Sequence, residues 1–298
     1  MDRVNKSPAW VARSSGRASR VSGSAMKGME TSLADLSAAL SAAVRSVGRE
    51  EIMPRYLKVA HSHKQDGSVF TEADLAAQHA LISRLQAIAA VPVLAEEQTE
   101  AEQRATWEAA SETGLWCVDP IDGTTNFVSG LPFFAISVAL IRAGRPVLGV
   151  VYDPAADEVF AAWAGGGATL NGVALPLRPP PSELSRCVGG IDFKRLSRDL
   201  AVRLVAHPPY ASQRNLGASA LDWCYLAAGR LHFYLHGGQK VWDYSAGWLI
   251  LTEAGGQAET LQGSSFWQGS PWTCSVQACL TPSLQEQLRG WMRSAPGG

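Results

Sequence analysis

An apolar segment that ends in two closely spaced aspartates places the strongest constraint on the fold of this chain. Residues 115–118 read as a buried strand, and the sequence Asp-Pro-Ile-Asp-Gly-Thr-Thr-Asn follows directly at 119–126. Because Pro120 lacks an amide donor and Gly123 favours a sharp turn, we expect the strand to stop and a rigid loop to follow. Both carboxylates of the loop can then converge on one point, although an ordinary turn would also explain the octapeptide by itself.

Two further acids stand beside apolar segments elsewhere in the chain. Glu96 follows a short strand expected over 91–95, and Asp243 lies at the start of a long helix expected over about 243–254. Taken singly, Glu96 reads as a surface acid and Asp243 as a helix N-cap. If these acids share a pocket with the two loop aspartates, each like-charged pair at ~4 Å costs about 4 kcal/mol at an effective dielectric constant near 20. Such a cluster implies divalent cations, and all-oxygen ligands favour magnesium.

Bulk composition limits the remaining possibilities. The chain has 298 residues, of which 46% are apolar and 18% charged, so it has enough apolar sequence for a large core. The 26 basic and 27 acidic residues create no overall field that favours nucleic acid or an anionic membrane. Five cysteines without paired spacing argue against a disulfide framework and a zinc site, so a reducing cytoplasm is expected. The longest apolar run, 131–141, is far shorter than the ~20 residues of a membrane-spanning helix.

Hydrophobic periodicity outlines the order of the elements. An amphipathic helix is expected over 32–47, a second helix begins at a capping box near Thr71, and three strands form an antiparallel meander within 133–163. Strand and helix patterns alternate after the three prolines at 179–181. Three regions are therefore expected: a disordered extension over 1–29, an α+β domain over 30–172 with the metal site, and an α/β domain over 173–298 that completes the site.

Four segments together resemble the inositol monophosphatase family. Residues 116–127 read WCVDPIDGTTNF and residues 241–256 read VWDYSAGWLILTEAGG, which are similar to the two signatures of that family. LAEEQ at 94–98 and KQDGSVFTEAD at 64–74 are similar to its upstream motifs, in the same order and spacing. The resemblance covers about residues 32–291 and implies an α+β fold, a layered αβαβα sandwich of the inositol monophosphatase and sugar phosphatase type.

The resemblance also implies a set of metal ligands. A first ion would be bound by Glu96, Asp119 and the carbonyl of Ile121, and a second by Asp119, Asp122 and Asp243. A third, weaker ion would involve Glu96. Two to three Mg²⁺ ions in this position would orient the phosphate and lower the pKa of a bound water.

Catalytic and substrate-binding roles follow from the same resemblance. Thr124 and Glu96 would position and help deprotonate the attacking water, and the amides of Gly123 and Thr124 would hold the phosphate oxygens. His236 stands where inositol-type members carry a glutamate that binds substrate hydroxyls, so the choice of substrate stays open. The implied catalytic residues are Glu96, Asp119, Asp122 and Thr124, and the implied substrate contacts are Asp122, Gly123, Thr124, Ser219, His236 and Asp243.

These expectations define a leading function and its alternatives. The leading prediction is a cytoplasmic, homodimeric, magnesium-dependent and lithium-sensitive phosphomonoesterase that acts on inositol monophosphate or a similar small polyol or sugar phosphate. Alternatives within the same chemistry are a 3'(2'),5'-bisphosphate nucleotidase and a histidinol-phosphatase. An alternative of another class is a transcription or RNA-associated interaction factor that keeps this fold. The expected partner is a small phosphorylated metabolite, with no membrane and no nucleic acid.

Overall fold

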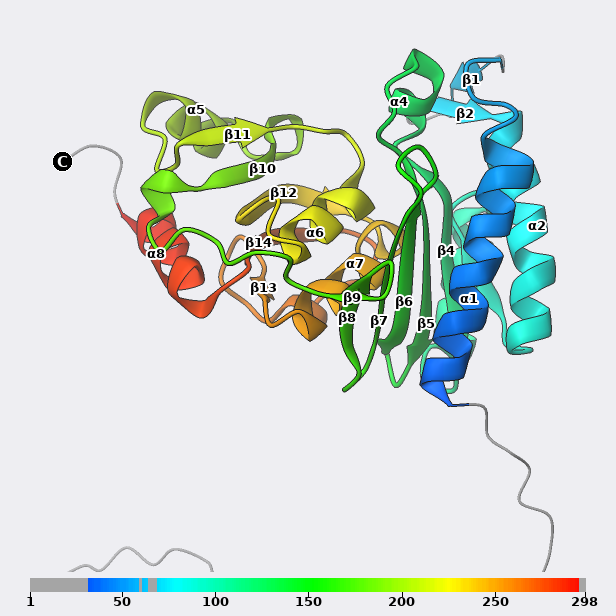
Figure 1. The fold of residues 1–298 in the computed structure, drawn as a ribbon. Coiled ribbons are helices and arrows are strands. Elements are labelled where there is room, and N and C mark those ends of the chain that lie inside the picture. The colour runs from blue at the N-terminus through cyan, green and yellow to red at the C-terminus, as the bar shows by residue number, and fades with distance from the viewer. Residues whose placement is uncertain (1–31, 59–60, 64–68, 295–298) are drawn as a thin grey trace, which may run out of the picture. The chain divides into compact units, whose positions relative to one another are not determined.

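The structure, a computed structural model, describes residues 32–58, 61–63 and 69–294 (Figure 1). Residues from Ser32 onward belong to one compact unit. The disordered extension predicted over 1–29 lies outside the described residues, as does the 64–68 part of the most N-terminal motif. Within the described ranges, no helix combines the length and the apolar character needed to cross a bilayer.

The first layer contains two helices that begin where the sequence predicted. The Ser32 hydroxyl accepts a hydrogen bond from the Asp35 amide, and the Thr71 side chain accepts one from Ala73 while Asp74 accepts from the Thr71 amide at 2.8 Å. These contacts satisfy amides that have no partner inside the helix. The elements of this layer are α1 (Leu33–Val47), the π-helical turn η1 (Gly48–Ile52), β1 (His61–His63), its antiparallel partner β2 (Val69–Thr71) and α2 (Glu72–Ile88).

A seven-stranded sheet forms the second layer, with its strands in sequence order from β3 to β9. β3 runs parallel to β4, and every later neighbour is antiparallel, which confirms the predicted meander. Its strands are β3 (Val93–Ala95), β4 (Leu115–Asp122), β5 (Ala135–Arg142), β6 (Arg145–Asp153), β7 (Glu158–Trp163), β8 (Gly167–Leu170) and β9 (Val173–Ala174). Two helices lie in its connections, α3 (Glu100–Ala110) and α4 (Thr124–Ser129).

A second sheet and four helices complete the fold. Its strand order is β11-β10-β12-β14-β13. The strands are β10 (Val188–Asp192), β11 (Ser212–Arg214), β12 (Phe233–Gln239), β13 (Gln257–Glu259) and β14 (Cys274–Cys279). The helices are α5 (Arg198–Ala206), α6 (Ser219–Ala227), α7 (Val241–Glu253) and α8 (Pro282–Arg293), with short 3₁₀ turns η2 (Leu184–Arg186), η3 (Phe193–Arg195) and η4 (Phe266–Gln268).

Three groups of buried side chains show how these layers stack. One group, which includes Leu40 and Leu81, joins α1 and α2 to one face of the seven-stranded sheet. A second, centred on α6 and α7 with Trp223, fills the space between the two sheets. A third, with Leu204 and Leu284, joins α5 and α8 to the outer face of the second sheet. Figure 1 shows the resulting order of helices, sheet, helices, sheet and helices, which confirms the predicted αβαβα sandwich.

The structure differs from the sequence predictions at three elements. β4 does not stop at Val118 but continues to Asp122, because its ladder with β5 is irregular between Asp119 and Asp122 and such a bulge accommodates proline. α3 was not predicted, although Thr99 and Glu102 form a capping box at its start. α8, which has proline in its first turn, was not predicted either.

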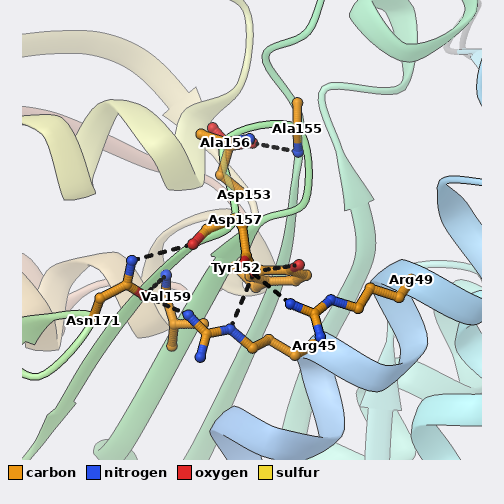
Figure 2. Close-up of polar contacts among 9 residues, drawn as sticks. All are labelled: Arg45, Arg49, Tyr152, Asp153, Ala155, Ala156, Asp157, Val159 and Asn171. Atoms are coloured by element: carbon orange, nitrogen blue, oxygen red, sulfur yellow. Dashed lines mark hydrogen bonds and ion pairs between the residues drawn. The ribbon is translucent and has the colours of Figure 1, made fainter.

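A polar cluster connects the first helical layer to the turn between β6 and β7 (Figure 2). Asp157 accepts a hydrogen bond from the Tyr152 hydroxyl at 3.0 Å, and its carboxylate lies 3.2 Å from Arg45 Nε and 3.1 Å from Arg49 Nη2. Asn171 accepts from Arg45 at 2.6 Å and donates to the Asp157 carbonyl at 3.2 Å. These contacts tie the end of α1 to two turns of the sheet.

Asp157→Asn should destabilise the protein by about 0.5–1 kcal/mol, because half-exposed ion pairs contribute little. The melting temperature should fall by roughly 1–3 °C, and added salt should reduce the difference from the wild type. Glu108→Gln is a suitable control, since Glu108 is exposed on α3 and has no ion pair among the described residues. An equal loss in both variants would show that the cluster adds no stability.

Candidate functional site

Three aspartates from two distant parts of the chain meet where β4 ends and α7 begins. Asp119 and Asp122 come from the irregular end of β4, and Asp243 comes from the first turn of α7. One carboxylate oxygen from each lies within 4.8 Å of the others. Asp119 and Asp122 are buried, whereas Asp243 is partly exposed. Five metal ligands were expected from the sequence. The structure brings the side chains of three of them, Asp119, Asp122 and Asp243, close together.

Backbone amides fix one oxygen of each carboxylate. Asp119 Oδ1 accepts from the Ile121 amide at 3.0 Å, and Asp122 Oδ2 accepts from the Ala220 amide of α6 at 2.6 Å. Asp243 Oδ2 accepts from the Lys240 amide at 2.8 Å. Lys240 is thus the N-cap of α7. The interpretation of Asp243, taken singly, as a helix N-cap was therefore wrong. The amides hold the side chains in place, and each carboxylate has a second oxygen for a cation.

The electrostatics of this cluster favour a cation strongly. Burial and the neighbouring charges of Glu96, Asp122 and Asp243 raise the pKa of Asp119 well above its usual range. Burial and Asp243 do the same to the pKa of Asp122. At a separation of 4.8 Å, each ionised pair repels by about 3.5 kcal/mol for an effective dielectric constant near 20. Three converging carboxylates that repel one another therefore fit a hard divalent ion such as Mg²⁺.

Glu96 lies beside the three aspartates at the end of β3. Its amide donates to the Val118 carbonyl at 3.1 Å, which continues the pairing of β3 with β4. Its carboxyl group contacts Asp119, because a hydrogen bond with Glu96 contributes to the raised pKa of that aspartate. Burial raises the pKa of Asp243, and the neighbouring Glu96 carboxylate adds to that rise. The predicted upstream acid is therefore next to the cluster.

A tight turn follows Asp122 and leads into α4. Gly123 has a φ of +87°, and a β-carbon there would lie 2.9 Å from the Ala218 side chain, so glycine is required. The Thr124 hydroxyl donates to the Ile121 carbonyl at 2.9 Å. The first amides of α4 have no acceptor within the helix and lie directly after Asp122. This places anion-binding groups beside a cation-binding cluster.

The two remaining predicted substrate contacts are engaged by the protein itself. The Ser219 hydroxyl lies 3.1 Å from the Tyr234 hydroxyl. His236 Nδ1 accepts from the Gly238 amide at 3.1 Å, and its Nε2 lies 3.3 Å from Asp192 Oδ2. Both imidazole nitrogens therefore have protein partners, and the roles of Ser219 and His236 in substrate binding stay predictions.

Several supporting residues could not be assigned from the sequence. Asn126 of α4 donates from its side chain to the Phe133 and Leu216 carbonyls, at 2.8 and 2.7 Å, and so joins α4 to the segment before α6. Asp222 is buried on α6, and burial followed by the charge of Asp192 raises its pKa. The sequence did contain one signal for Asp222, because it is an acidic residue within the mostly apolar sequence of α6.

Comparisons with known proteins show which family this chain resembles. The chain matches the inositol monophosphatase family over residues 30–294. The protein called Nus factor SuhB of Pasteurella multocida is 41% identical over 160 residues, which cover 52% of this chain and 60% of that protein. Inositol-1-monophosphatase of Mesorhizobium japonicum is 39% identical over 168 residues, covering 54% and 62%. The similar region thus spans about three fifths of the length of these two relatives.

Solved structures extend the similarity across the fold. The extragenic suppressor protein suhB of Bartonella henselae superposes with a TM-score of 0.74 at 26% identity, covering 87% of this chain and 98% of that one. An IMPase from Thermotoga maritima gives a TM-score of 0.69 at 27% identity, covering 85% and 97%. With the family match extending over nearly all described residues and the same layered fold in both structures, the chain belongs to the inositol monophosphatase family.

Proposed function

We propose that this protein is a magnesium-dependent phosphomonoesterase that hydrolyses a small polyol, sugar or inositol phosphate. The observation that carries the proposal is the convergence of three carboxylates within 4.8 Å, next to the first turn of α4, whose amides have no acceptor within the helix. Asp119, Asp122 and Asp243 would hold two to three Mg²⁺ ions, with Glu96 and the Ile121 carbonyl as further ligands. When bound, the ions supply charge neutralisation for the phosphate and a lowered pKa for the attacking water.

The protein groups contribute position and proton transfer. The amides of Gly123 and Thr124 receive the phosphate oxygens, because glycine permits a close approach and the first turn of a helix offers unpaired donors. The Thr124 hydroxyl already donates to the Ile121 carbonyl, so its lone pairs are oriented to accept a hydrogen bond from water. Glu96 takes up the proton of that water. In-line attack then needs no covalent phosphoenzyme.

A cysteine nucleophile does not suit this chemistry. All five cysteines are free and buried. Cys117 lies closest in sequence to the cluster, and burial raises the pKa of its thiol far above the ordinary value. The reactive form of cysteine is the thiolate, which this environment disfavours. Water is therefore the better nucleophile.

Phosphate release from a panel of inositol, sugar, nucleotide and histidinol phosphates tests the proposal. Turnover should require Mg²⁺, stop with EDTA, and fall when lithium is added. EDTA-resistant turnover would contradict the assignment of the aspartates as metal ligands. Absence of turnover with a folded, magnesium-loaded protein would contradict a phosphatase function for these substrates.

A second candidate is an interaction factor in transcription, because the Pasteurella multocida relative is called a Nus factor. The two functions separate in the Asp119→Asn protein. Binding of RNA polymerase or RNA by both the wild type and this variant, together with no phosphatase activity in either, would favour the interaction role. The homodimer, the cytoplasmic location and the absence of a nucleic-acid partner stay predictions that accompany the phosphatase proposal.

A further inference from the structure

A chain of side-chain hydrogen bonds runs from the core to the first residue of α6. Trp223 Nε1 donates to Gln239 Oε1 at 2.9 Å, and Gln239 Nε2 donates to the Tyr234 hydroxyl at 2.9 Å. The Tyr234 hydroxyl lies 3.1 Å from the Ser219 hydroxyl. The first three side chains are no more than 1% exposed, whereas Ser219 is partly exposed. The chain therefore ends at a hydroxyl that a bound molecule can reach.

The donor and acceptor types along this chain fix its direction. An indole nitrogen can only donate, so the Gln239 oxygen faces Trp223 and the Gln239 nitrogen faces Tyr234. The Tyr234 oxygen accepts that bond, and its own buried hydrogen needs another acceptor. Ser219 Oγ is within reach, whereas Asp222 Oδ1 has no hydrogen-bond partner in the described part of the chain. Ser219 thus accepts from Tyr234 and keeps its own hydrogen for another acceptor.

Direct contacts place the start of α6 against the acidic cluster. Ser219 is the first residue of α6, and the amide of the next residue, Ala220, donates to Asp122 Oδ2 at 2.6 Å. A β-carbon at Gly123 would lie 3.3 Å from the Gly217 carbonyl oxygen, two residues before Ser219. Ser219 is therefore one residue from an amide bonded to a predicted metal ligand, at the turn proposed to receive the phosphate.

We propose that Ser219 donates a hydrogen bond to an acceptor oxygen in the alcohol portion of the substrate, and that Gln239, acting through Tyr234, is the positioning residue that sets this direction. The inference rests on the proposed phosphatase function. A hydroxyl or ether oxygen near the ester pairs with the Ser219 hydrogen, whereas an alkyl group leaves it unpaired and an ammonium group offers only hydrogens. The site therefore favours polyol and sugar phosphates over alkyl and amino-alcohol phosphates of similar size.

Two phosphate esters of matched shape test the role of Ser219. The compound 1,3-dimethoxypropan-2-yl phosphate carries ether oxygens, which only accept, and heptan-4-yl phosphate carries methylene groups in their place. Ser219→Ala should lower the ratio of kcat/KM for the ether over the alkyl ester about three- to tenfold, mainly through KM, which is the contribution of one hydrogen bond. Glycerol 2-phosphate serves as the reference substrate for both proteins.

The possible outcomes separate this inference from the phosphatase proposal. Turnover of glycerol 2-phosphate without turnover of the ether, or with an unchanged ratio in Ser219→Ala, would overturn the inference and leave the phosphatase proposal intact. Hydrolysis of none of the three esters would contradict both. Ser275→Ala is the matched control and should keep the ratio, because Ser275 is a partly exposed serine whose hydroxyl bonds with Leu261 and Gln262 after β13.

A double-mutant cycle tests the positioning role of Gln239. Gln239→Met keeps the shape of the side chain and removes the amide, so the Tyr234 oxygen becomes free to accept from Ser219 instead. The ether-to-alkyl ratio should then fall about two- to threefold, since Ser219 divides its hydrogen between Tyr234 and the substrate. In the Ser219→Ala background, Gln239→Met should leave the ratio unchanged. An equal loss in both backgrounds, or no loss in either, would overturn the role of Gln239.

Discussion

Asp122→Asn should lower magnesium-dependent phosphate release by more than about 100-fold, since even partners outside the ligand shell of a metal commonly contribute 10–100-fold. Asparagine keeps an oxygen to accept from the Ala220 amide, so the loop and the start of α6 should stay in place. It removes one negative charge that the ions require. Steady-state kinetics with saturating Mg²⁺ and a melting curve in EDTA provide the two measurements.

The melting curve separates loss of a ligand from loss of the fold. Removing one of three repelling carboxylates should leave the metal-free protein at least as stable as the wild type, because each ionised pair is unfavourable. Asp153→Asn is the control: Asp153 is another buried aspartate, and it accepts from the Ala155 and Ala156 amides away from the cluster. That variant should keep its activity. Near-normal activity in Asp122→Asn would rule out Asp122 as an essential ligand.

In EDTA, the stability of the protein should fall as pH rises from about 5 to 8, and Mg²⁺ should reverse the fall. Burial raises the pKa of Asp243 from its usual 3.8 to about 7, so the folded state holds a proton that the unfolded state has released. Since the folded state binds more protons in this range, the free energy of unfolding decreases with pH. Asp243 alone predicts a loss of about 2.7 kcal/mol, or roughly 5 °C in melting temperature.

Other groups also titrate in this range: Asp119 and Asp122, whose pKa values burial raises as well, add to the fall, so a variant is needed. Carboxyl groups with a lowered pKa, such as Asp157, are ionised in both states above pH about 5 and add no slope. Burial lowers the pKa of His232, which makes stability rise with pH below about 6.5. The difference between the wild type and Asp243→Asn cancels both effects. A difference that does not change between pH 5 and 8, or that Mg²⁺ does not affect, would contradict the proposed coupling.

Local sequence signals predicted α1, α2 and the meander. α1 and α2 begin at the expected caps because Ser32 and Thr71 bind amides within their own first turn. The end of β4 was predicted less well, since the sequence shows that Pro120 cannot donate to a ladder but not that the ladder with β5 shifts there. A bulge depends on the neighbouring strand, which local patterns do not specify.

The sequence by itself determined which acids would stand at the ends of apolar segments, and their resemblance to family motifs indicated which of them belong together. Only the tertiary structure decided how those acids are held. The amide that fixes Asp122 comes from Ala220, and Asp243 reaches the same point because α7 packs between the two sheets. Contacts between segments distant in the chain arise from the packing of whole layers, for which no short sequence pattern carries a signal.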